Sequence, residues 1–431
     1  MRSLKLGTFG LAGLILLALC ATRQARADVS LLLEEPYGHF GAFTATGHAA
    51  VYLTRVCAET PVVLRRCEDG ENGVVISRYD KVGGYDWIAI PLVPYLYAVE
   101  DQEDIPLYAN PKLVAFLRNE YRKKYLENIV PDAANGEPPE GNWTQLAGAS
   151  YDRTIYGFKI ETSEEQDDRF IREYNSRENQ SHFNLLSQNC ADFSRGVIDF
   201  YFPRAVHRSL VADLGITTPK QIAKSLVKFS ERHSDLEFSR YVIPQVPGSV
   251  ARSKPVHGVV VSMLKSKDYM LPVVILHPVV AGCLVVAAVG LERFDPAKGA
   301  MVSEAGPQLE PPMASTERRA YRDQLALWTR ENPAVKARRN EKVLAQAEPE
   351  FDGDGHPMLK LRLSEEEVVG MGVSRGNILG SDSSPVFAQQ LLAERLHEEL
   401  KSGNTAKVSQ AEVSSDWKLL QQVIPAKAGL D

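Results

Sequence analysis

The order of apolar and polar positions divides the chain into two apolar runs, a patterned region between them and a charged tail. The first run extends from Leu6 to Leu19, near the N-terminus. The second extends from Met270 to Leu291 without a formal charge, which is close to the ~20 residues that cross a bilayer as a helix. Between them, apolar residues recur with strand spacing in some stretches and helix spacing in others. The pattern therefore predicts a folded domain between two apolar segments.

Both kinds of element are expected in the patterned region, which makes it an α+β domain over residues 28–250. Alternating or β-branched stretches predict strands at His48–Leu53, Val62–Leu64, Val74–Tyr79, Trp87–Pro91 and Thr154–Ile160. Helical spacing predicts helices at Pro111–Asn128, Glu164–Ser176, Cys190–Phe202 and Pro219–His233. We expect a small antiparallel sheet packed against these helices, with Cys190 on a central helix that faces the strand of His48.

The first apolar run is typical of an export signal. A weakly positive start precedes it, and Ala25-Arg-Ala27 supplies the small residues that signal peptidase requires. We therefore expect residues 1–27 to be a signal peptide and the mature chain to begin near Asp28. A competing interpretation makes Cys20 the acylated residue of a lipoprotein signal, but Leu19 is larger than the residue expected before such a cysteine.

The second apolar run predicts a transmembrane helix over residues 270–291. Pro272, His277 and Pro278 count against it, because internal prolines kink a helix and histidine prefers water or a polar partner. The alternative is a buried helix or a pair of core strands, which the many β-branched residues favour. With the signal peptide removed, a membrane span would leave residues 28–268 outside the cell membrane and the tail in the cytoplasm.

Residues 293–431 have the composition of a charged, partly disordered tail with few aromatic side chains. Helical pieces are expected at Ser315–Glu331 and Pro385–Lys401, and a strand at Met358–Leu363. Asp352-Gly-Asp-Gly355 lacks the remaining ligand spacing of a calcium loop, so we expect a turn there. Such a tail leaves room for a cytoplasmic partner.

The overall charge argues against nucleic acid as a partner. A net charge of -6 and a pI near 5.9, without a long Lys/Arg block, give no electrostatic basis for nucleic-acid binding. The sequence also lacks a phosphate-binding glycine loop and the Cys/His spacing of a zinc site. We therefore expect no cofactor and no metal ion.

The cysteines point to one reactive thiol. Cys57 and Cys67 flank a stretch short enough for a hairpin, and in an oxidising compartment we expect them to form a disulfide; two unpaired thiols in adjacent strands are the alternative. Cys20 would leave with the signal peptide, and Cys283 lies in the second apolar run. Cys190 is left without an obvious partner, which is unusual in an exported domain.

Cys190 begins a predicted helix, and far upstream His48 begins a predicted strand. The positive end of a helix dipole and the free backbone N–H groups there lower the pKa of a thiol. A histidine within reach would act as the base, and thiol and imidazole are the minimum set for acyl transfer through a thioester. Asn189 or Gln188 is placed to donate a hydrogen bond to the developing oxyanion.

The residue that would orient His48 is less obvious. The next strands offer the segment Ser77-Arg-Tyr79 but no Asp, Asn or His, so Ser77 is the candidate for this role. His39 and His182 are alternative bases. A single cysteine or histidine is more often a buried packing residue than a catalytic one. Their presence together in an exported chain favours a catalytic site.

A resemblance to a known family rests on two segments, Gly47-His-Ala-Ala-Val-Tyr-Leu53 and, much later, Asn189-Cys-Ala-Asp-Phe193. Together they resemble the permuted branch of the NlpC-type papain-like superfamily, which includes lecithin:retinol acyltransferase, its relatives and bacterial periplasmic domains of the Lnb type. In that branch the strand with the histidine precedes the helix with the cysteine. The resemblance covers roughly residues 30–215. It implies a papain-like fold with Cys190 as nucleophile and His48 as base.

These expectations combine into a membrane-anchored thiol hydrolase or acyltransferase that faces the periplasm of a bacterial cell. Its substrate would be an amide or ester, in a cell-wall peptide or a lipid acyl group. The alternative is a non-catalytic envelope domain whose papain-like cleft binds a ligand and is coupled through the membrane span to the tail. The presence of both Cys190 and His48 favours the enzyme, whereas the lack of an obvious third residue favours the alternative.

Overall fold

The computed structural model describes residues 27–38, 46–265, 294–303, 345–362 and 368–374, with internal gaps at 81, 140–141, 210–212 and 247 and a few single positions elsewhere. Most of the predicted signal peptide, the alternative base His39 and the predicted tail helices lie outside the described residues.

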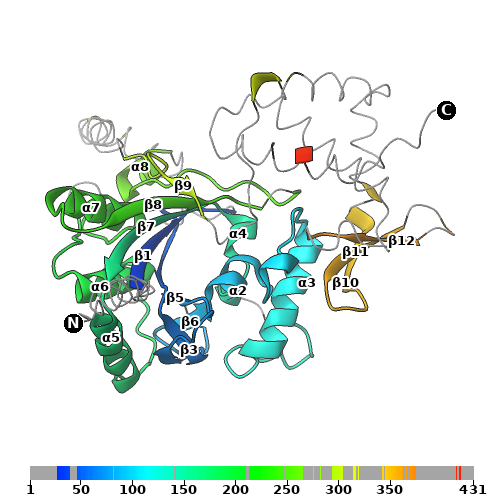
Figure 1. The fold of residues 1–431 in the computed structure, drawn as a ribbon, viewed down its shortest axis with the longest axis horizontal. Coiled ribbons are helices and arrows are strands. Elements are labelled where there is room, and N and C mark those ends of the chain that lie inside the picture. The colour runs from blue at the N-terminus through cyan, green and yellow to red at the C-terminus, as the bar shows by residue number, and fades with distance from the viewer. Residues whose placement is uncertain are drawn as a thin grey trace, which may run out of the picture.

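A seven-stranded sheet, in the order β6-β5-β2-β1-β7-β8-β9, forms the centre of the described structure (Figure 1). The strands are β1 (Ala27–Glu34), β2 (His48–Leu53), β5 (Val74–Ser77), β6 (Ile88–Pro91), β7 (Ile155–Thr162), β8 (Phe238–Ile243) and β9 (Met301–Val302). Neighbouring strands are antiparallel, except that β8 and β9 are parallel. The prediction of an α+β fold is confirmed, but the small antiparallel sheet is wrong because the sheet is larger and mixed.

The central strand, β1, was not predicted because it is buried on both faces. Leu32 packs with Ala50 and Val75 on one face of the sheet, whereas Leu31 and Leu33 pack on the other. A strand that is covered on both sides reads as a continuous apolar run and loses the alternation that identifies a strand with one solvent-facing side. The missing strand accounts for much of the underestimated sheet.

Helices cover both faces of this sheet (Figure 1). One group packs with Leu31 and Leu33: α5 (Glu164–Ser176), α6 (Cys190–Tyr201) and α7 (Pro219–Arg232). The other packs with Leu32: α2 (Leu92–Tyr97), α3 (Pro111–Tyr121) and α4 (Ala149–Asp152). Shorter elements are η2 (Gln102–Asp104), η3 (Arg122–Leu126, a π-helical turn after α3), η4 (Asn142–Gln145) and α8 (Val259–Lys265).

Local sequence determines where the main helices begin. Ser163 forms a reciprocal capping box with Gln166 at the start of α5. Asn110 and Thr218 cap α3 and α7, each directly before a proline at the first helical position. These signals are local, so the predicted starts of the four helices are confirmed, and for α5 and the strand β2 both ends agree with the prediction.

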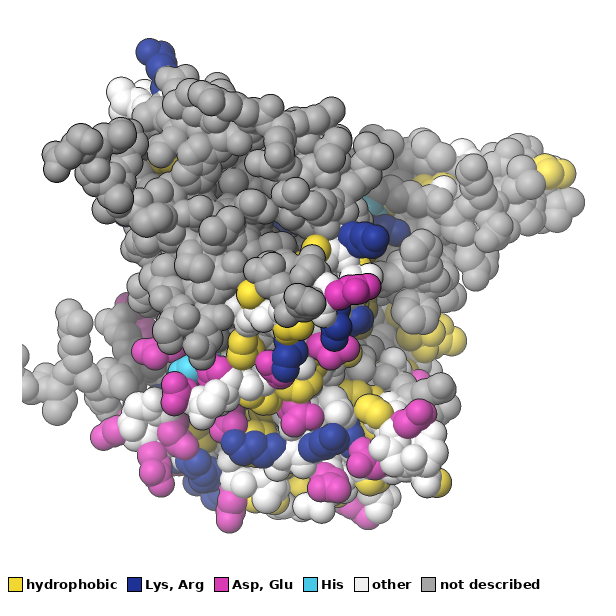
Figure 2. Space-filling view, turned by 90° about the vertical axis from the view of Figure 1, so that its right-hand side faces the viewer, with side chains coloured by type: hydrophobic (Ala, Val, Ile, Leu, Met, Phe, Trp, Pro, Cys, Tyr) yellow, Lys and Arg dark blue, Asp and Glu magenta, His cyan; other side chains and the backbone are white. Residues whose placement is uncertain are grey.

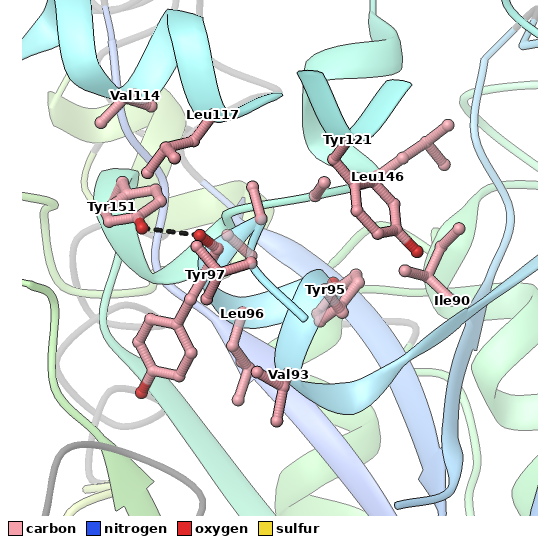
Figure 3. Packing of buried hydrophobic residues seen from close by; sticks show 14 of the residues in the cluster. Ile90, Val93, Tyr95, Leu96, Tyr97, Val114, Leu117, Tyr121, Leu146 and Tyr151 are labelled. Atoms are coloured by element: carbon pink, nitrogen blue, oxygen red, sulfur yellow. Dashed lines mark hydrogen bonds between the residues drawn. The ribbon is translucent and has the colours of Figure 1, made fainter. Parts of the chain in front are cut away.

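The core on the α2 side is rich in tyrosine (Figure 3). Tyr95, Tyr97 and Tyr151 are fully buried, and the Tyr151 hydroxyl donates to the Tyr97 carbonyl at 2.6 Å. Buried hydroxyl groups are costly without partners, so these contacts fix how α2 and α4 pack. The Tyr95 hydroxyl donates instead to the carboxylate of Glu34, which joins this core to the end of β1.

A two-stranded ribbon beside the sheet carries the disulfide. It consists of β3 (Val56–Thr60) and β4 (Val63–Arg66), and Cys57 is bonded to Cys67 just after it, with an S–S distance of 2.07 Å. The predicted pairing of these two cysteines is confirmed. Cys190 is the free cysteine among the described residues, also as predicted.

Part of the predicted tail belongs to the domain core. A three-stranded sheet of β10 (Glu348–Phe351), β11 (Pro357–Arg362) and β12 (Val368–Gly372) packs beside α3, and its residues Leu359 and Met371 join the α2-side core. The Leu107 N–H donates to the Val373 carbonyl at 2.7 Å. The predicted strand is confirmed, as is the turn at Asp352, whose side chain accepts from two following backbone N–H groups.

These contacts join residues of the predicted tail to the core on the α2 side: Ala347, Leu359, Leu361, Met371 and Val373 are among its buried residues. On the side of the molecule that carries this small sheet, acidic and basic side chains are interspersed over the described surface (Figure 2).

The predicted transmembrane helix is also corrected. None of the helices in the described part of the chain is long and apolar enough to cross a membrane. Almost all of the segment 270–291, on which the prediction rested, lies outside the described residues. An apolar run of sufficient length is a weak criterion when prolines interrupt it, because it also fits segments buried in protein.

Candidate functional site

The candidate site lies at one end of the large sheet. Glu34 ends β1 and is the register partner of His48, which begins β2, while Ser77 ends β5. Cys190 is the first residue of α6, which packs across β1, β2 and β5. The fold therefore brings His48, Ser77 and Cys190 to the same end of the sheet, although they are far apart in sequence.

Gly47 shapes the entry of the chain into β2. Its φ is +76°, and a Cβ at this position would lie 2.1 Å from the carbonyl oxygen of Glu34. Both the backbone conformation and the close approach exclude a side chain. Gly47 thus allows β2 to start directly beside the end of β1, which places His48 next to Glu34.

His48 is held by Ser77. The Nε2 atom lies 3.0 Å from the Ser77 Oγ, and the Ser77 hydroxyl donates to the Ala49 carbonyl at 2.8 Å. Because that carbonyl can only accept, we assign the hydroxyl hydrogen to it and the proton on His48 to Nε2. The lone pair is then on Nδ1, which is the atom available to receive a proton. Ser77 is thus hydrogen-bonded to His48, the residue that it was predicted to orient.

Tyr79 packs against the face of the His48 imidazole. Its ring stacks on that of His48 with a centroid distance of 5.4 Å, and its buried hydroxyl, which has no well-formed hydrogen bond among the described residues, lies within reach of the Tyr95 side chain. Burial raises the pKa of the Tyr79 phenol, with the charge of Glu34 acting in the same direction. A neutral phenol with an unused O–H group is a donor for a developing negative charge. The sequence placed Tyr79 near the site without giving it a role.

Burial also determines the charge state of His48. Desolvation, reinforced by the positive charge of Arg153, lowers the pKa of the imidazole to about 3. The ring is therefore neutral at pH 7, which is the state that a general base requires.

Cys190 has the position predicted for it but not the predicted pKa. Desolvation of the thiol raises its pKa to about 11, although the N–H groups of Ala49 and Ala191 act in the opposite direction. The expectation of a lowered thiol pKa is wrong for this arrangement, because burial outweighs the helix N-terminus. The thiol is protonated at pH 7.

Cys190 and His48 lie near the same end of β2 but belong to different sides of the sheet. His48 and Tyr79 share the α2 side of the sheet, whereas the body of α6 packs on the other side with Ala49. Within the described structure no hydrogen bond joins the Cys190 thiol to His48. The charge of Glu34 nevertheless affects the pKa of both Cys190 and Tyr79. The structure therefore places the two predicted catalytic groups near the same end of the sheet without a hydrogen bond between them.

Asn189 caps α6 and has no donor left for an oxyanion. Its side-chain oxygen accepts from the Asp192 N–H, and its amide donates to the Leu185 and Thr217 carbonyls at 3.0 and 3.1 Å. The Asp192 side chain in turn accepts from the Asn189 N–H, which completes a capping box. The structure therefore gives Asn189 the task of fixing the first turn of the cysteine helix.

A buried ion pair lies behind the site. Arg153 and Glu34 are almost completely inaccessible to solvent, with 2.9 Å between Nη1 and Oε2. Desolvation raises the pKa of Glu34, and the Arg153 charge opposes that rise. The guanidinium also lies over the ring of Tyr37, 4.5 Å from its centroid. No sequence pattern around Arg153 indicates that it belongs to the site. Glu34 is a charged residue at the end of an apolar run, and this could have indicated a buried polar role.

A polar cavity of about 660 Å³ adjoins the site. Asp80, which follows Tyr79, lines it, together with Gln188, two residues before Cys190. His182, the alternative base, lies in its wall. A second cavity of about 500 Å³ shares Asp80 and is lined mainly by apolar residues, including Trp143. Both cavities are large enough for part of a small substrate.

Comparisons with protein-family models, curated proteins and solved structures give no match to this chain.

Proposed function

We propose that this chain is an exported thiol hydrolase or acyltransferase that cleaves an amide or ester through a thioester on Cys190. The arrangement that carries the proposal is the chain of hydrogen bonds from His48 Nε2 through Ser77 to the Ala49 carbonyl, at the sheet end where a free cysteine begins a helix. It leaves His48 Nδ1 as the proton acceptor. In a catalytic triad the nucleophile gives its proton to a histidine that a third residue orients, and Cys190, His48 and Ser77 would take these three roles. The permuted papain-like resemblance belongs to the same proposal.

In this mechanism the proton of the Cys190 thiol moves to His48 Nδ1 as Sγ bonds to the substrate carbonyl carbon. The electron pair of the carbonyl moves onto oxygen, which accepts a hydrogen bond from the Tyr79 hydroxyl. Collapse of this intermediate expels the amine or alcohol, which takes the proton from Nδ1. Water or an acceptor alcohol or amine then attacks the thioester by the reverse sequence. Ser77 holds the imidazole in the required tautomer throughout.

The pKa values of the two groups set a condition on this mechanism. Because the pKa is about 11 for the thiol and about 3 for the imidazole, both groups are neutral at pH 7, and proton transfer from the thiol to the imidazole is unfavourable in the free protein. Substrate binding must therefore bring Cys190 and His48 together at the moment of attack. Catalytic hydrogen bonds are commonly longer in a free enzyme than in its substrate complex.

The disulfide supports the compartment part of the proposal. Disulfides such as Cys57–Cys67 persist in oxidising compartments and are rare in the cytosol. Together with the predicted signal peptide, it favours export, and we propose the periplasm of a bacterial cell as the location.

The acyl-enzyme provides the test. The purified protein is mixed with p-nitrophenyl acetate, and the intact mass and the acetylated peptide are determined by mass spectrometry. We expect acetylation of Cys190 and a burst of nitrophenolate, both lost in Cys190→Ala. An enzyme that hydrolyses the ester equally well with alanine at position 190 would contradict the assignment of the nucleophile.

A second candidate is a non-catalytic domain that binds its ligand in the cavities. The raised pKa of Cys190 and its missing hydrogen bond with His48 favour this alternative. It predicts that iodoacetamide alkylates Cys190 slowly and that no acyl donor modifies it. The same mass-spectrometric experiment therefore separates the two functions.

A further inference from the structure

The two cavities beside the site are separated by a single acidic residue. Asp80 lines both the polar cavity of about 660 Å³ and the apolar cavity of about 500 Å³. Gly83 lies on the apolar side and Gly84 on the polar side, both with positive φ, so the chain turns sharply between them. The cavities are thus two halves of a groove, with Asp80 at their junction.

The Asp80 carboxylate has no hydrogen bond or ion pair with any residue that the structure describes. Other acidic groups nearby are neutralised: Asp86 is paired with Arg78 at 2.7 Å, and Asp132, which also lines the apolar half, is paired with Arg122. Among the residues that the structure describes, nothing compensates the negative charge of Asp80, which lies in a partly enclosed space. A ligand cation at this position would gain more from it than from an exposed carboxylate, because the surroundings screen the charge less.

The lining of each half indicates what else the ligand carries. The half nearest Cys190 is walled by groups that donate and accept hydrogen bonds: Ser181, His182, Asn184, Ser187 and Gln188. The far half is walled by apolar side chains: Val82, Ile129, Val130, Pro131 and Trp143. Polar groups close to the thiol suit a backbone of amides better than a hydrocarbon chain, which would leave them unsatisfied.

We propose that the groove binds a peptide amide that carries a primary ammonium group, and that Asp80 selects this group. This inference rests on the proposed function, to which it adds the substrate class. The amides lie along the polar half, the ammonium group pairs with Asp80 and an apolar side chain enters the half with Trp143. The ammonium group comes from a free peptide N-terminus or from the side chain of a diamino acid.

Binding to the full chain with Cys190→Ala tests the inference without any reaction. Three probes are compared by calorimetry: alanyl-alanine amide, N-acetyl-alanyl-alanine amide and N-acetyl-alanyl-lysine amide. We expect the N-acetyl-alanyl-alanine amide, which has no ammonium group, to bind about tenfold more weakly than the better of the two amines. Which amine binds better identifies the source of the ammonium group.

Asp80→Asn, added to Cys190→Ala, should remove this preference because it keeps the shape of the side chain and deletes its charge. Asp69→Asn is the matched control, since Asp69 is exposed and lines neither cavity. A preference that survives Asp80→Asn, equal binding of all three probes or no binding of any would each overturn the inference. Near-ultraviolet circular dichroism checks that the variant is folded.

The outcomes for Asp80 and for the proposed function are separable. If Cys190→Ala binds amines in an Asp80-dependent manner but the wild-type protein forms no acyl-enzyme, the groove inference stands and catalysis fails. If Cys190 is acylated by p-nitrophenyl acetate but amine and acetylated probes bind alike, catalysis stands and the groove inference fails.

Discussion

The two sides of the candidate site differ in how completely they are fixed. On the strand side, His48 is bonded to Ser77, stacked on Tyr79 and backed by the Glu34–Arg153 ion pair. On the helix side, the Cys190 thiol is held only by its place at the start of α6 and by two backbone N–H groups. Under the proposed mechanism, this difference means that the fold preorganises His48 and leaves Cys190 to be brought into contact by the substrate.

Burial keeps both groups neutral, but its effect is reinforced on one side and opposed on the other. The charge of Arg153 adds to the effect of burial in lowering the pKa of the imidazole, whereas the backbone N–H groups at the start of α6 oppose the effect of burial on the thiol. A thiolate–imidazolium pair would require both barriers to be overcome together. In the free protein both groups therefore oppose the proton transfer that the proposed mechanism needs.

The largest effect should follow from breaking the ion pair behind the strand side. Arg153→Met leaves the Glu34 carboxylate buried without compensation, and we expect a loss of about 3–5 kcal/mol in the free energy of unfolding. Urea denaturation measures it. Arg66→Met is the control, because its ion pair with Asp168 is exposed and should contribute about 1 kcal/mol or less.

Adding Glu34→Gln to Arg153→Met should restore much of this stability, because it removes the unpaired charge. If Arg153→Met costs no more than Arg66→Met, the ion pair does not support the strand side and the contrast between the two sides loses its basis.

A smaller effect is expected from Ser77→Ala, which frees the imidazole to adopt the other tautomer. The rate of acylation of Cys190 should fall by about 10- to 100-fold, because part of the general-base contribution depends on that tautomer. Stability should change little. The measurement is the burst rate with p-nitrophenyl acetate, and Ser77→Thr is the control that keeps the hydroxyl. Equal rates in Ser77→Ala and wild type would remove Ser77 from the site.

The sequence predicts the helix side of the site better than the strand side. The start of α6 follows from Asn189 and Asp192, whose spacing is that of a capping box, and the same spacing explains why Asn189 is not free to bind an oxyanion. On the strand side, His48 was identified in the same way, from the residues next to it. These signals lie within a few positions of the residues they identify.

The roles of Ser77, Tyr79 and Arg153 depend on register and packing. Val51 pairs with Ile76, and this alignment puts Ser77 and Tyr79 on the same face as His48. A shift of one residue would turn both away, and no local pattern fixes that alignment. Arg153 reaches Glu34 from a separate part of the chain. The sequence also could not show whether burial or the helix dipole would control the pKa of Cys190, because burial is a property of the folded chain.

The pH dependence of stability should have opposite signs on the two sides of the site. The pKa of His48 is lowered from 6.5 to about 3, so between these pH values the unfolded chain binds a proton that the folded chain does not. Stability attributable to His48 is therefore lost as the pH falls through this window. The pKa of Cys190 is raised from 9.0 to about 11, so the unfolded thiol ionises first and stability is lost as the pH rises through that window.

Urea midpoints measured from pH 4 to pH 10.5 separate the two contributions by difference. His48→Gln should flatten the acid window relative to wild type and leave the alkaline window unchanged, and Cys190→Ser should do the reverse. Other groups titrate in both windows, but they contribute equally to variant and wild type and cancel in the difference. A flat difference for Cys190→Ser would mean that the thiol is as solvated in the folded chain as in the unfolded one. Burial would then not be what holds the proton on the thiol, and the asymmetry between the two sides would reside in the hydrogen bonds of His48 alone.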